Sequence, residues 1–282
     1  MRTPLFVATG AALAAAAVAS AALAVGMPGN AHRVTHADLK AVNFVENCAF
    51  SHRAPDDPIV HAGMPGMSHD HSFVGNVSTN ALSTLASLQA AGTTCKKVAD
   101  TAAYWMPTLY QGTAQVLPVG ATIYYRRNTL AAVRPFPSGL KMIAGDSAAT
   151  ARQSLGVTYW NCGVEGDARP TSTVPTCPSG RRTMLRLHVR FPSCWDGHSL
   201  DSADHKSHMA YPVANRCPAS HPVAVPAIEL IYRYPIQGGS DVSLASGGQL
   251  SGHGDFFNAW QQPALRRLVN GCLNALVHCG QG

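Results

Sequence analysis

Three short segments of this 282-residue chain concentrate side chains that bind metals or move protons. They span residues 68–73, 201–212 and 251–257 and together hold five of the thirteen histidines. Imidazole is both a common metal ligand and the usual general base near neutral pH. Because only 13% of the residues are charged, about half the usual share, this concentration of polar groups indicates a functional site.

The first segment, Ser68-His69-Asp70-His71-Ser72-Phe73, predicts a metal-binding pair. On an extended strand, His69 and His71 project to the same face, as two ligands of one ion must. A histidine-rich set favours zinc or copper over calcium. The competing interpretation is a solvated pair of histidines in an exposed loop.

The other two segments predict catalytic groups. We expect His205 or His208 to act as a base or a ligand and Lys206 to stabilise negative charge on a substrate. In the third segment, glycine-flanked His253 and Asp255 stand before an apolar helical pattern. The predicted catalytic set is His71, His205, Lys206, His208, His253 and Asp255. The structural alternatives are an Asx turn at Asp201 or Asp204 and an N-cap at Asp255.

Aromatic residues near these segments are candidates for substrate binding. Trp105, Tyr211 and Trp260 have rings large enough to stack on sugars. The alternative is that these rings fill the core of the protein.

The N-terminus predicts export from the cytoplasm. Arg2 precedes an alanine-rich apolar run, and Ala22-Leu23-Ala24 suits signal cleavage. We therefore expect a signal peptide over 1–24, a flexible segment over 25–40 and one globular domain over 41–282. An uncleaved segment would instead anchor the chain in a membrane. A cut after Ala31 would expose His32 as an N-terminal copper ligand.

The eight cysteines fit an exported protein, since their number is even and no C-x-x-C pair occurs. Cys162–Cys177 and Cys194–Cys217 are the preferred bridges because each closes a short loop rich in turn residues. Cys272 and Cys279 would lie about 10 Å apart along one helix. They can bridge only if that helix ends between them.

The expected elements are mostly short strands. Residues 186–191 alternate, with Leu187, Val189 and Phe191 on one face, and residues 227–234 follow a similar pattern. Further strands are expected over 41–45, 115–118, 122–126, 141–143, 157–160 and 209–211. Helices are expected over 78–91 and 256–278. The predicted fold is mainly β with a few helices: a disulfide-stabilised antiparallel β-sandwich or jelly-roll-like core with a C-terminal helix.

Composition and missing motifs exclude several classes of function. The chain has no G-x-S-x-G, P-loop, G-x-G-x-x-G or H-E-x-x-H motif, which disfavours serine hydrolases, nucleotide enzymes and HExxH metalloproteases. A net charge of +6 with dispersed arginines does not favour nucleic acid as a partner. It is compatible with acidic extracellular polymers.

Several strings resemble the domain-of-unknown-function 1996 family of secreted fungal and actinobacterial proteins. The most specific are FPSCWDG at 191–197 and LDSADHKSHMAYP at 200–212. The others are DPIV at 57–60, HDHSFVGN at 69–76, YWMP at 104–107, FPSGLKMIAGD at 136–146, CPASHP at 217–222 and HGDF at 253–256. The resemblance covers about residues 42–276 and implies a single secreted domain. Members are sometimes joined to wall- or carbohydrate-binding modules, but the resemblance supplies no reaction.

Two hypotheses of different class follow. In the first, the protein is an exported hydrolase or lyase acting on an extracellular polysaccharide or cell-wall polymer through the His/Asp-rich site. In the second, it is a non-catalytic wall- or carbohydrate-binding protein whose histidines are structural or hold a metal.

Overall fold

The computed structural model describes Met1 and residues 34–180 and 183–281. Residues 34–282 belong to one compact unit. The predicted signal peptide over 1–24, its cleavage sites and His32 lie outside the described residues. Residues 25–33, the start of the segment expected to be flexible, also lie outside the described residues.

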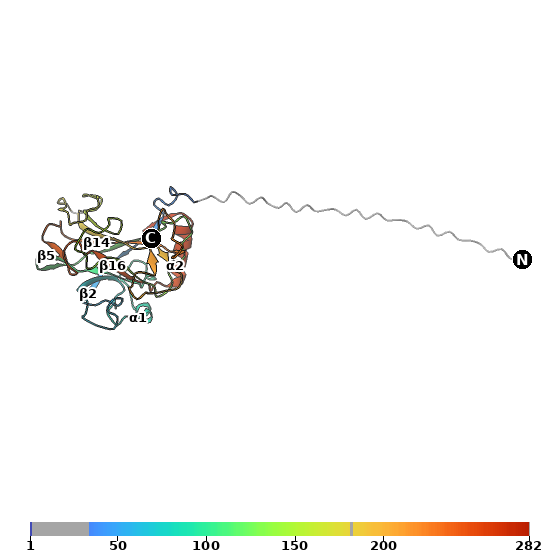
Figure 1. Ribbon diagram of the computed structural model, residues 1–282, viewed down its shortest axis with the longest axis horizontal. Coiled ribbons are helices and arrows are strands. Elements are labelled where there is room, and N and C mark those ends of the chain that lie inside the picture. The colour runs from blue at the N-terminus through green and yellow to red at the C-terminus, as the bar shows by residue number, and fades with distance from the viewer. Residues whose placement is uncertain (2–33, 181–182, 282) are drawn as a thin grey trace. The chain divides into compact units, whose positions relative to one another are not determined.

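Two antiparallel-rich sheets dominate the described part of the chain (Figure 1). The first has six strands in the order β17 (His278–Gln281), β1 (Asn43–Cys48), β7 (Gly120–Arg126), β14 (Ala227–Tyr234), β10 (Leu185–Arg190) and β9 (Thr158–Asn161). The second has five strands in the order β2 (Phe50–Ala54), β3 (His71–Gly75), β4 (Ala103–Pro107), β16 (His253–Phe257) and β8 (Lys141–Gly145). All the pairings in these two sheets are antiparallel except β1 with β17.

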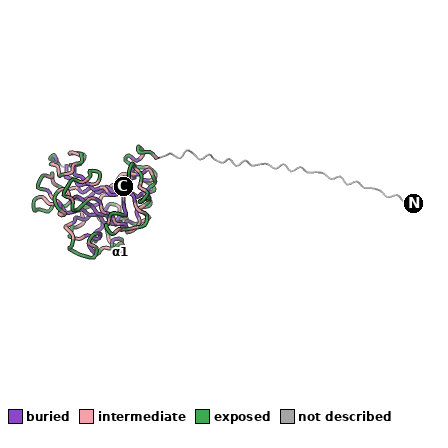
Figure 2. Tube along the Cα trace, viewed as in Figure 1, coloured by how far each residue is buried: buried purple, intermediate pink, exposed green. Residues whose placement is uncertain are grey.

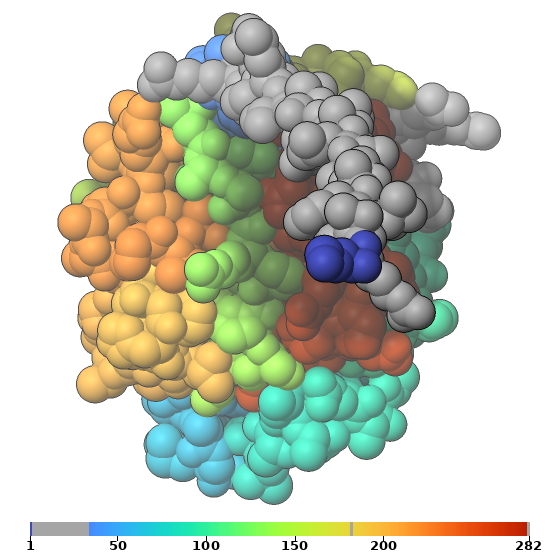
Figure 3. Space-filling model, turned by 90° about the vertical axis from the view of Figure 1, so that its right-hand side faces the viewer, coloured from blue at the N-terminus to red at the C-terminus, as the bar shows by residue number. Residues whose placement is uncertain are grey.

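Two smaller sheets and three helical elements accompany the two large sheets. One three-stranded sheet comprises β12 (Met209–Ala210), β11 (Cys194–Trp195) and β13 (Val223–Ala224), and another comprises β15 (Val242–Leu244), β5 (Leu109–Gln111) and β6 (Ala114–Val116). The helical elements are α1 (Leu85–Ala90), α2 (Gln262–Leu268) and a π-helical turn η1 (Val269–Asn274). Figure 3 shows the C-terminal segment beside the segment of residues 80–100, where Gln261 donates from its backbone N–H to the carbonyl of Ala99.

The main core lies between the two large sheets, which makes the architecture a β-sandwich. Alternating side chains such as Leu187 and Tyr232 from the first sheet meet Tyr104 and Phe256 from the second. Figure 2 shows this buried interior within a shell of exposed loops. The Tyr232 hydroxyl donates to the carbonyl of Ser72 at 2.7 Å and so joins the two sheets. The predicted fold class is therefore confirmed.

The five-stranded sheet is also covered on its outer face, and this positions the site described below. Phe73, Trp105 and Phe257 form a second apolar cluster there with Ile59 and Leu88. Period-two alternation places every other residue of β3, β4 and β16 on this face. The loop before β3 and helix α1 supply the covering residues.

All eight cysteines lie in the described residues and form four disulfides: Cys48–Cys95, Cys162–Cys177, Cys194–Cys217 and Cys272–Cys279. The two bridges preferred from the sequence are confirmed. The last pair bridges because the helical turn ends at Asn274 and Cys279 lies in β17.

The predicted C-terminal helix is present, but the bounds predicted for it, 256–278, are too long at both ends. Residues 253–257 form strand β16, helix α2 begins at Gln262, and the chain returns as β17. Asp255 therefore lies inside a strand and does not cap a helix. The helix predicted over 78–91 is also shorter, because α1 starts after Thr84, whose side chain forms a capping box with Ser87.

Most of the predicted strands are present, with shifted ends, and the structure adds strands that the sequence patterns do not predict, among them β2 and β3. In the described part of the chain, no helix has the length and apolar character required to cross a bilayer.

Candidate functional site

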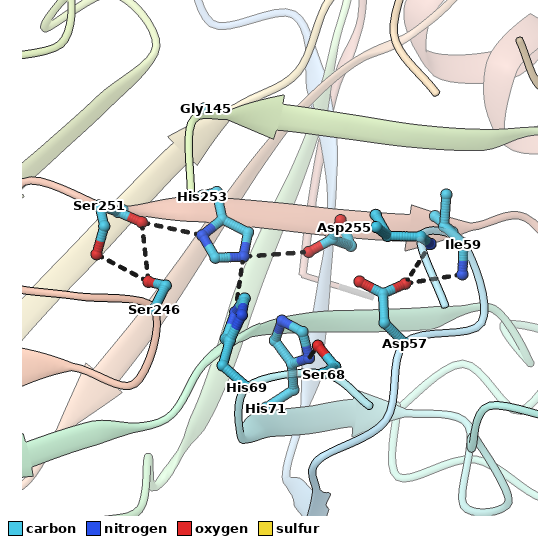
Figure 4. A network of polar contacts seen from close by, with 12 residues as sticks. Asp57, Ile59, Ser68, His69, His71, Gly145, Ser246, Ser251, His253 and Asp255 are labelled. Atoms are coloured by element: carbon cyan, nitrogen blue, oxygen red, sulfur yellow. Dashed lines mark hydrogen bonds and ion pairs between the residues drawn. The ribbon is translucent and has the colours of Figure 1, made fainter. Parts of the chain in front are cut away.

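A cluster of histidines and carboxylates lies on the outer face of the five-stranded sheet (Figure 4). His71 on β3 pairs with Pro107 on β4. On the other side of β4, Asp255 pairs with Trp105, so His253 and Asp255 share the outer face with His71. The His71 and His253 rings lie 5.7 Å apart between centroids. The sheet register thus joins two segments that are 182 residues apart.

His69 completes the group from the loop that precedes β3. Its ring centroid lies 4.2 Å from that of His71, and its Nε2 lies 3.2 Å from Nε2 of His253. Arg53 holds the loop through an ion pair with Asp70 at 2.8 Å. One ring nitrogen from each of the three histidines lies within 4.8 Å of the other two.

Backbone carbonyls fix the orientation of two of these rings. His71 Nδ1 lies 3.0 Å from the carbonyl of Asp56, and His253 Nδ1 lies 2.9 Å from the carbonyl of Ser251. A carbonyl only accepts hydrogen bonds, so each Nδ1 carries the proton. In the neutral rings, both Nε2 atoms therefore present lone pairs to the cluster.

Two buried carboxylates border the histidines. Asp255 Oδ2 lies 3.9 Å from His253 Nε2. Asp57 lies in the covering loop, where its Oδ1 accepts from the backbone N–H groups of Ile59 and Val60. An oxygen of each carboxylate and a nitrogen of His71 lie within 4.8 Å of one another.

Burial sets the protonation of the cluster. It lowers the pKa of His71 well below its ordinary value and that of His253 to about 3, and the neighbouring histidines act in the same direction. Burial also raises the pKa of Asp255 well above its usual range, helped by the negative charge of Asp57. The histidines are consequently neutral at physiological pH, which is the form that binds metal ions.

A cleft of about 210 Å³ opens over this cluster, lined by His69, His253, Asp255 and Asp57. Asp204, His205 and Lys206 line the same cleft from a loop between β11 and β12. All three segments singled out from the sequence thus contribute to one cavity.

The 201–208 loop has a defined internal structure. His205 Nδ1 donates to Asp201 Oδ1 at 2.9 Å, which leaves Nε2 as the acceptor nitrogen. The backbone of His205 is left-handed, with φ of 58°, a conformation that non-glycine residues adopt at a cost. Asp204 holds the turn by accepting from the N–H groups of Lys206 and Ser207. Lys206 Nζ donates to the carbonyl of Gly145 at 2.9 Å and ties the loop to β8.

His208 occupies a different position from His205. Its side chain is buried, with Nε2 2.7 Å from the carbonyl of Lys141 and Nδ1 2.9 Å from the Ser202 hydroxyl. These contacts use both ring nitrogens. In the described structure His208 is not among the residues that line the cleft, and its contacts are those of a structural histidine.

None of the three predicted aromatic platforms is among the described residues that line the cleft. Trp105 and Trp260 are fully buried, and the indole N–H of Trp260 donates to the Tyr125 hydroxyl at 2.9 Å. Neither ring has an exposed face for a sugar, so both serve as core residues in this conformation. Tyr211 is exposed and lines a separate groove with Arg126 and Arg190.

Two site residues were missed in the sequence reading. Asp57 belongs to the covering loop, and Asp201, which had been given only a turn role, orients His205. Sequence spacing could have identified both residues. Asp201 precedes His205 by four residues, and Asp57 follows β2, the strand that pairs with β3.

A family model described as "Domain of unknown function (DUF1996)" matches residues 57–260. Neither curated proteins nor solved structures yielded a match to this chain. The matched range contains the three clustered histidines, the two carboxylates Asp57 and Asp255, and the 201–208 loop.

Proposed function

Since the chain belongs to the domain-of-unknown-function 1996 family, whose description assigns no reaction, we propose a function from the cleft. We propose that the protein is an exported enzyme that acts on an extracellular polysaccharide or cell-wall polymer. The four disulfides support export, because such bridges persist in oxidising compartments.

The convergence of three distant segments on one cleft carries the proposal. Residues 57–69, 204–206 and 253–255 bring imidazole, carboxylate and ammonium groups to the same cavity. Reactive sites are concave and contain a few convergent polar groups. Only 13% of the residues are charged, yet several ionisable groups are buried together at this one place. Solubility does not account for this arrangement, whereas a reactive site does.

His205 is the proposed general base. Asp201 accepts a hydrogen bond from the Nδ1–H group and so fixes the tautomer, which leaves Nε2 free to take a proton from water or from a sugar carbon. In the first case the deprotonated water attacks the anomeric carbon and the glycosidic C–O bond breaks, which makes the enzyme a hydrolase. In the second case the carbon that loses its proton forms a C=C bond as the neighbouring C–O bond to the leaving sugar breaks, which makes it a lyase. In both cases the leaving oxygen takes a proton from solvent. Lys206 supplies positive charge for an anionic group of the substrate or for charge that develops during the reaction. His253 and Asp255 form the floor against which the polymer lies.

The test is turnover of a panel of acidic and neutral wall polysaccharides by the exported protein. We expect His205→Ala to lower kcat by about 10²- to 10⁴-fold, the usual contribution of a general base. Asp201→Asn should lower kcat in the same direction by misorienting the ring. An unsaturated sugar end in the product identifies a lyase, and its absence identifies a hydrolase.

His198→Ala is the matched control, because His198 is an exposed histidine with 78% of its side chain accessible. Its turnover should equal that of the parent protein. Unchanged turnover in His205→Ala, with the fold intact by circular dichroism, would contradict the assignment of the base. Absence of turnover on every polymer would contradict the enzyme hypothesis.

One observation favours the second candidate, a carbohydrate- or wall-binding protein. Tyr211 lies in a groove of about 370 Å³ on the outer side of the six-stranded sheet, with Arg126 and Arg190 beside it. Both guanidinium groups contact the single carboxylate of Glu229. Two positive groups and one negative group leave an excess of positive charge, which suits an acidic polymer.

This candidate is tested by retention on immobilised polygalacturonate. Tyr211→Ala should weaken retention, whereas Glu229→Gln should strengthen it, because it removes the competing carboxylate. Asp167→Asn is the charge-matched control for Glu229→Gln, since it also removes one negative charge, at an exposed ion pair with Arg169. Equal retention of all the variants would exclude the groove.

A further inference from the structure

We propose that His69, His71 and His253, with Asp255 as an additional donor, bind one divalent transition-metal ion at the floor of the cleft, with Zn²⁺ the best match. This proposal deepens the proposed function, because the ion would sit at the proposed reactive centre. Its test does not depend on turnover.

The donor atoms have the separation that a zinc ion requires. Tetrahedral zinc with Zn–N bonds of about 2.0–2.1 Å places two nitrogen ligands about 3.3–3.4 Å apart. The Nε2 atoms of His69 and His253 lie 3.2 Å apart, and one ring nitrogen of each of the three histidines lies within 4.8 Å of the other two. Small rotations of these side chains would bring three nitrogens around one ion.

Hydrogen bonds to the far side of two rings resemble the outer shell of a metal site. Metal-binding histidines usually donate their second N–H to a carbonyl or carboxylate, which fixes the ring and the tautomer. His71 and His253 donate from Nδ1 to the carbonyls of Asp56 and Ser251. Each ring is therefore held with its Nε2 lone pair directed into the cluster (Figure 4).

Unpartnered buried atoms provide a second, independent observation. His71 is fully buried and Asp255 is 1% exposed. Among the described residues, neither His71 Nε2 nor Asp255 Oδ2 has a hydrogen-bond partner. A buried polar atom without a partner is costly, and a missing ion is one of its established explanations. A simple hydrogen bond between His69 and His253 accounts for neither atom.

The charges of the site also balance with a divalent ion. Asp57 and Asp255 are both buried next to three neutral imidazoles. In the metal-bound site, two ionised carboxylates and one divalent cation would sum to zero, which offsets the cost of burying two like charges. Imidazole with carboxylate selects zinc or copper over calcium and magnesium, which prefer oxygen ligands.

The experiment is metal analysis of the purified, disulfide-bonded protein after exhaustive chelation and reloading with Zn²⁺. We expect about one Zn²⁺ per chain. Loading with Co²⁺ should produce the visible absorption bands of a four-coordinate histidine site.

Variants assign the ligands. His71→Ala and His253→Ala should each weaken Zn²⁺ binding by at least about 100-fold, more than the loss of an outer-shell partner. Asp255→Asn should weaken it by about 10-fold, as expected for a donor outside the three nitrogens. His198→Ala is the histidine control and should bind like the parent. His71→Gln, which preserves polarity and approximate volume, provides a folded alternative should the alanine variant unfold.

Binding of less than about 0.1 Zn²⁺, Co²⁺ or Cu²⁺ per chain after reloading would overturn the proposal. So would full binding by folded His71 and His253 variants. Metal binding without turnover would support the site and contradict the enzyme hypothesis. Turnover that survives complete chelation would support the enzyme hypothesis and would contradict a position of the ion at the reactive centre, while the measured metal content still decides whether the ion binds.

Discussion

The buried carboxylate of Glu229 organises the outer face of the six-stranded sheet, and neutralising it should destabilise the protein. Its Oε1 accepts from the Tyr159 hydroxyl at 2.8 Å, from Arg190 Nε at 3.2 Å and from His188 Nδ1 at 3.2 Å. Its Oε2 accepts from Arg126 at 3.0 Å. In Glu229→Gln, the amide oxygen can replace Oε1, whereas the amide N–H₂ group would face Arg126.

The magnitude follows from these contacts. One charge-assisted bond is lost and three are weakened because their acceptor becomes neutral, with typical values of about 1.5–3 kcal/mol for bonds to charged groups and about half that for neutral ones. Both arginines are more than one-third exposed, so water replaces part of what they lose. We therefore expect a loss of about 3 kcal/mol, which for a chain of this size lowers Tm by about 6–12 °C.

The effect should also depend on pH. Burial alone raises the pKa of Glu229, but the hydrogen bond from His188 and the charges of Arg190 and Arg126 outweigh it and lower the pKa below its ordinary value of 4.5. A carboxyl with a depressed folded-state pKa stabilises the fold above its unfolded pKa and loses this contribution as pH falls towards the folded value. The difference between parent and variant should thus be full at pH 7 and shrink below about pH 4.5.

The assay is urea unfolding of both proteins at pH 7 and at pH 3. Asp167→Asn is the control, since Asp167 forms an exposed ion pair with Arg169 and should leave the unfolding midpoint unchanged. A difference below about 1 kcal/mol at pH 7 for Glu229→Gln, or one that grows on acidification, would refute the reasoning.

Two further substitutions test how the sheets position the site. Gly145 has a φ of 84°, and a Cβ added to it would lie 2.8 Å from Cα of His253. Gly145→Ala should therefore lower the free energy of unfolding in urea by at least about 2 kcal/mol and weaken Zn²⁺ binding. Gly271→Ala should be tolerated, because no described atom beyond its own helix and chain neighbours lies within 4 Å of its added Cβ; destabilisation equal to that of Gly145→Ala would contradict the steric argument. Tyr232→Phe should cost about 1–2 kcal/mol by removing the buried bond to Ser72 that joins the two sheets. Tyr110→Phe is the control, because it removes only an exposed hydroxyl contact and should unfold at the same urea concentration as the parent. An equal loss of unfolding free energy in both variants would contradict a stabilising role for the bond between the sheets.

Local sequence patterns predicted the strands whose apolar residues alternate. They failed to predict strands whose extended conformation depends on pairing with distant segments. Residues 227–234 were predicted with their observed bounds because alternation is a property of the strand itself. Residues 256–257 are predicted as the start of a helix, with Asp255 as its cap, because their apolar spacing continues into α2. Their extended conformation depends on pairing with both β4 and β8, which no local pattern reveals.

By itself, the sequence determined the class of fold and two of the four disulfides, and it indicated the three segments that supply side chains to the cleft. Residue types, alternation and loop lengths are local properties, and they were enough for these conclusions. The tertiary structure alone decided that His71 and His253 flank one strand, that His205 is paired with Asp201 and that His208 faces the interior. These facts depend on sheet register and loop packing, which bring together atoms about 180 residues apart.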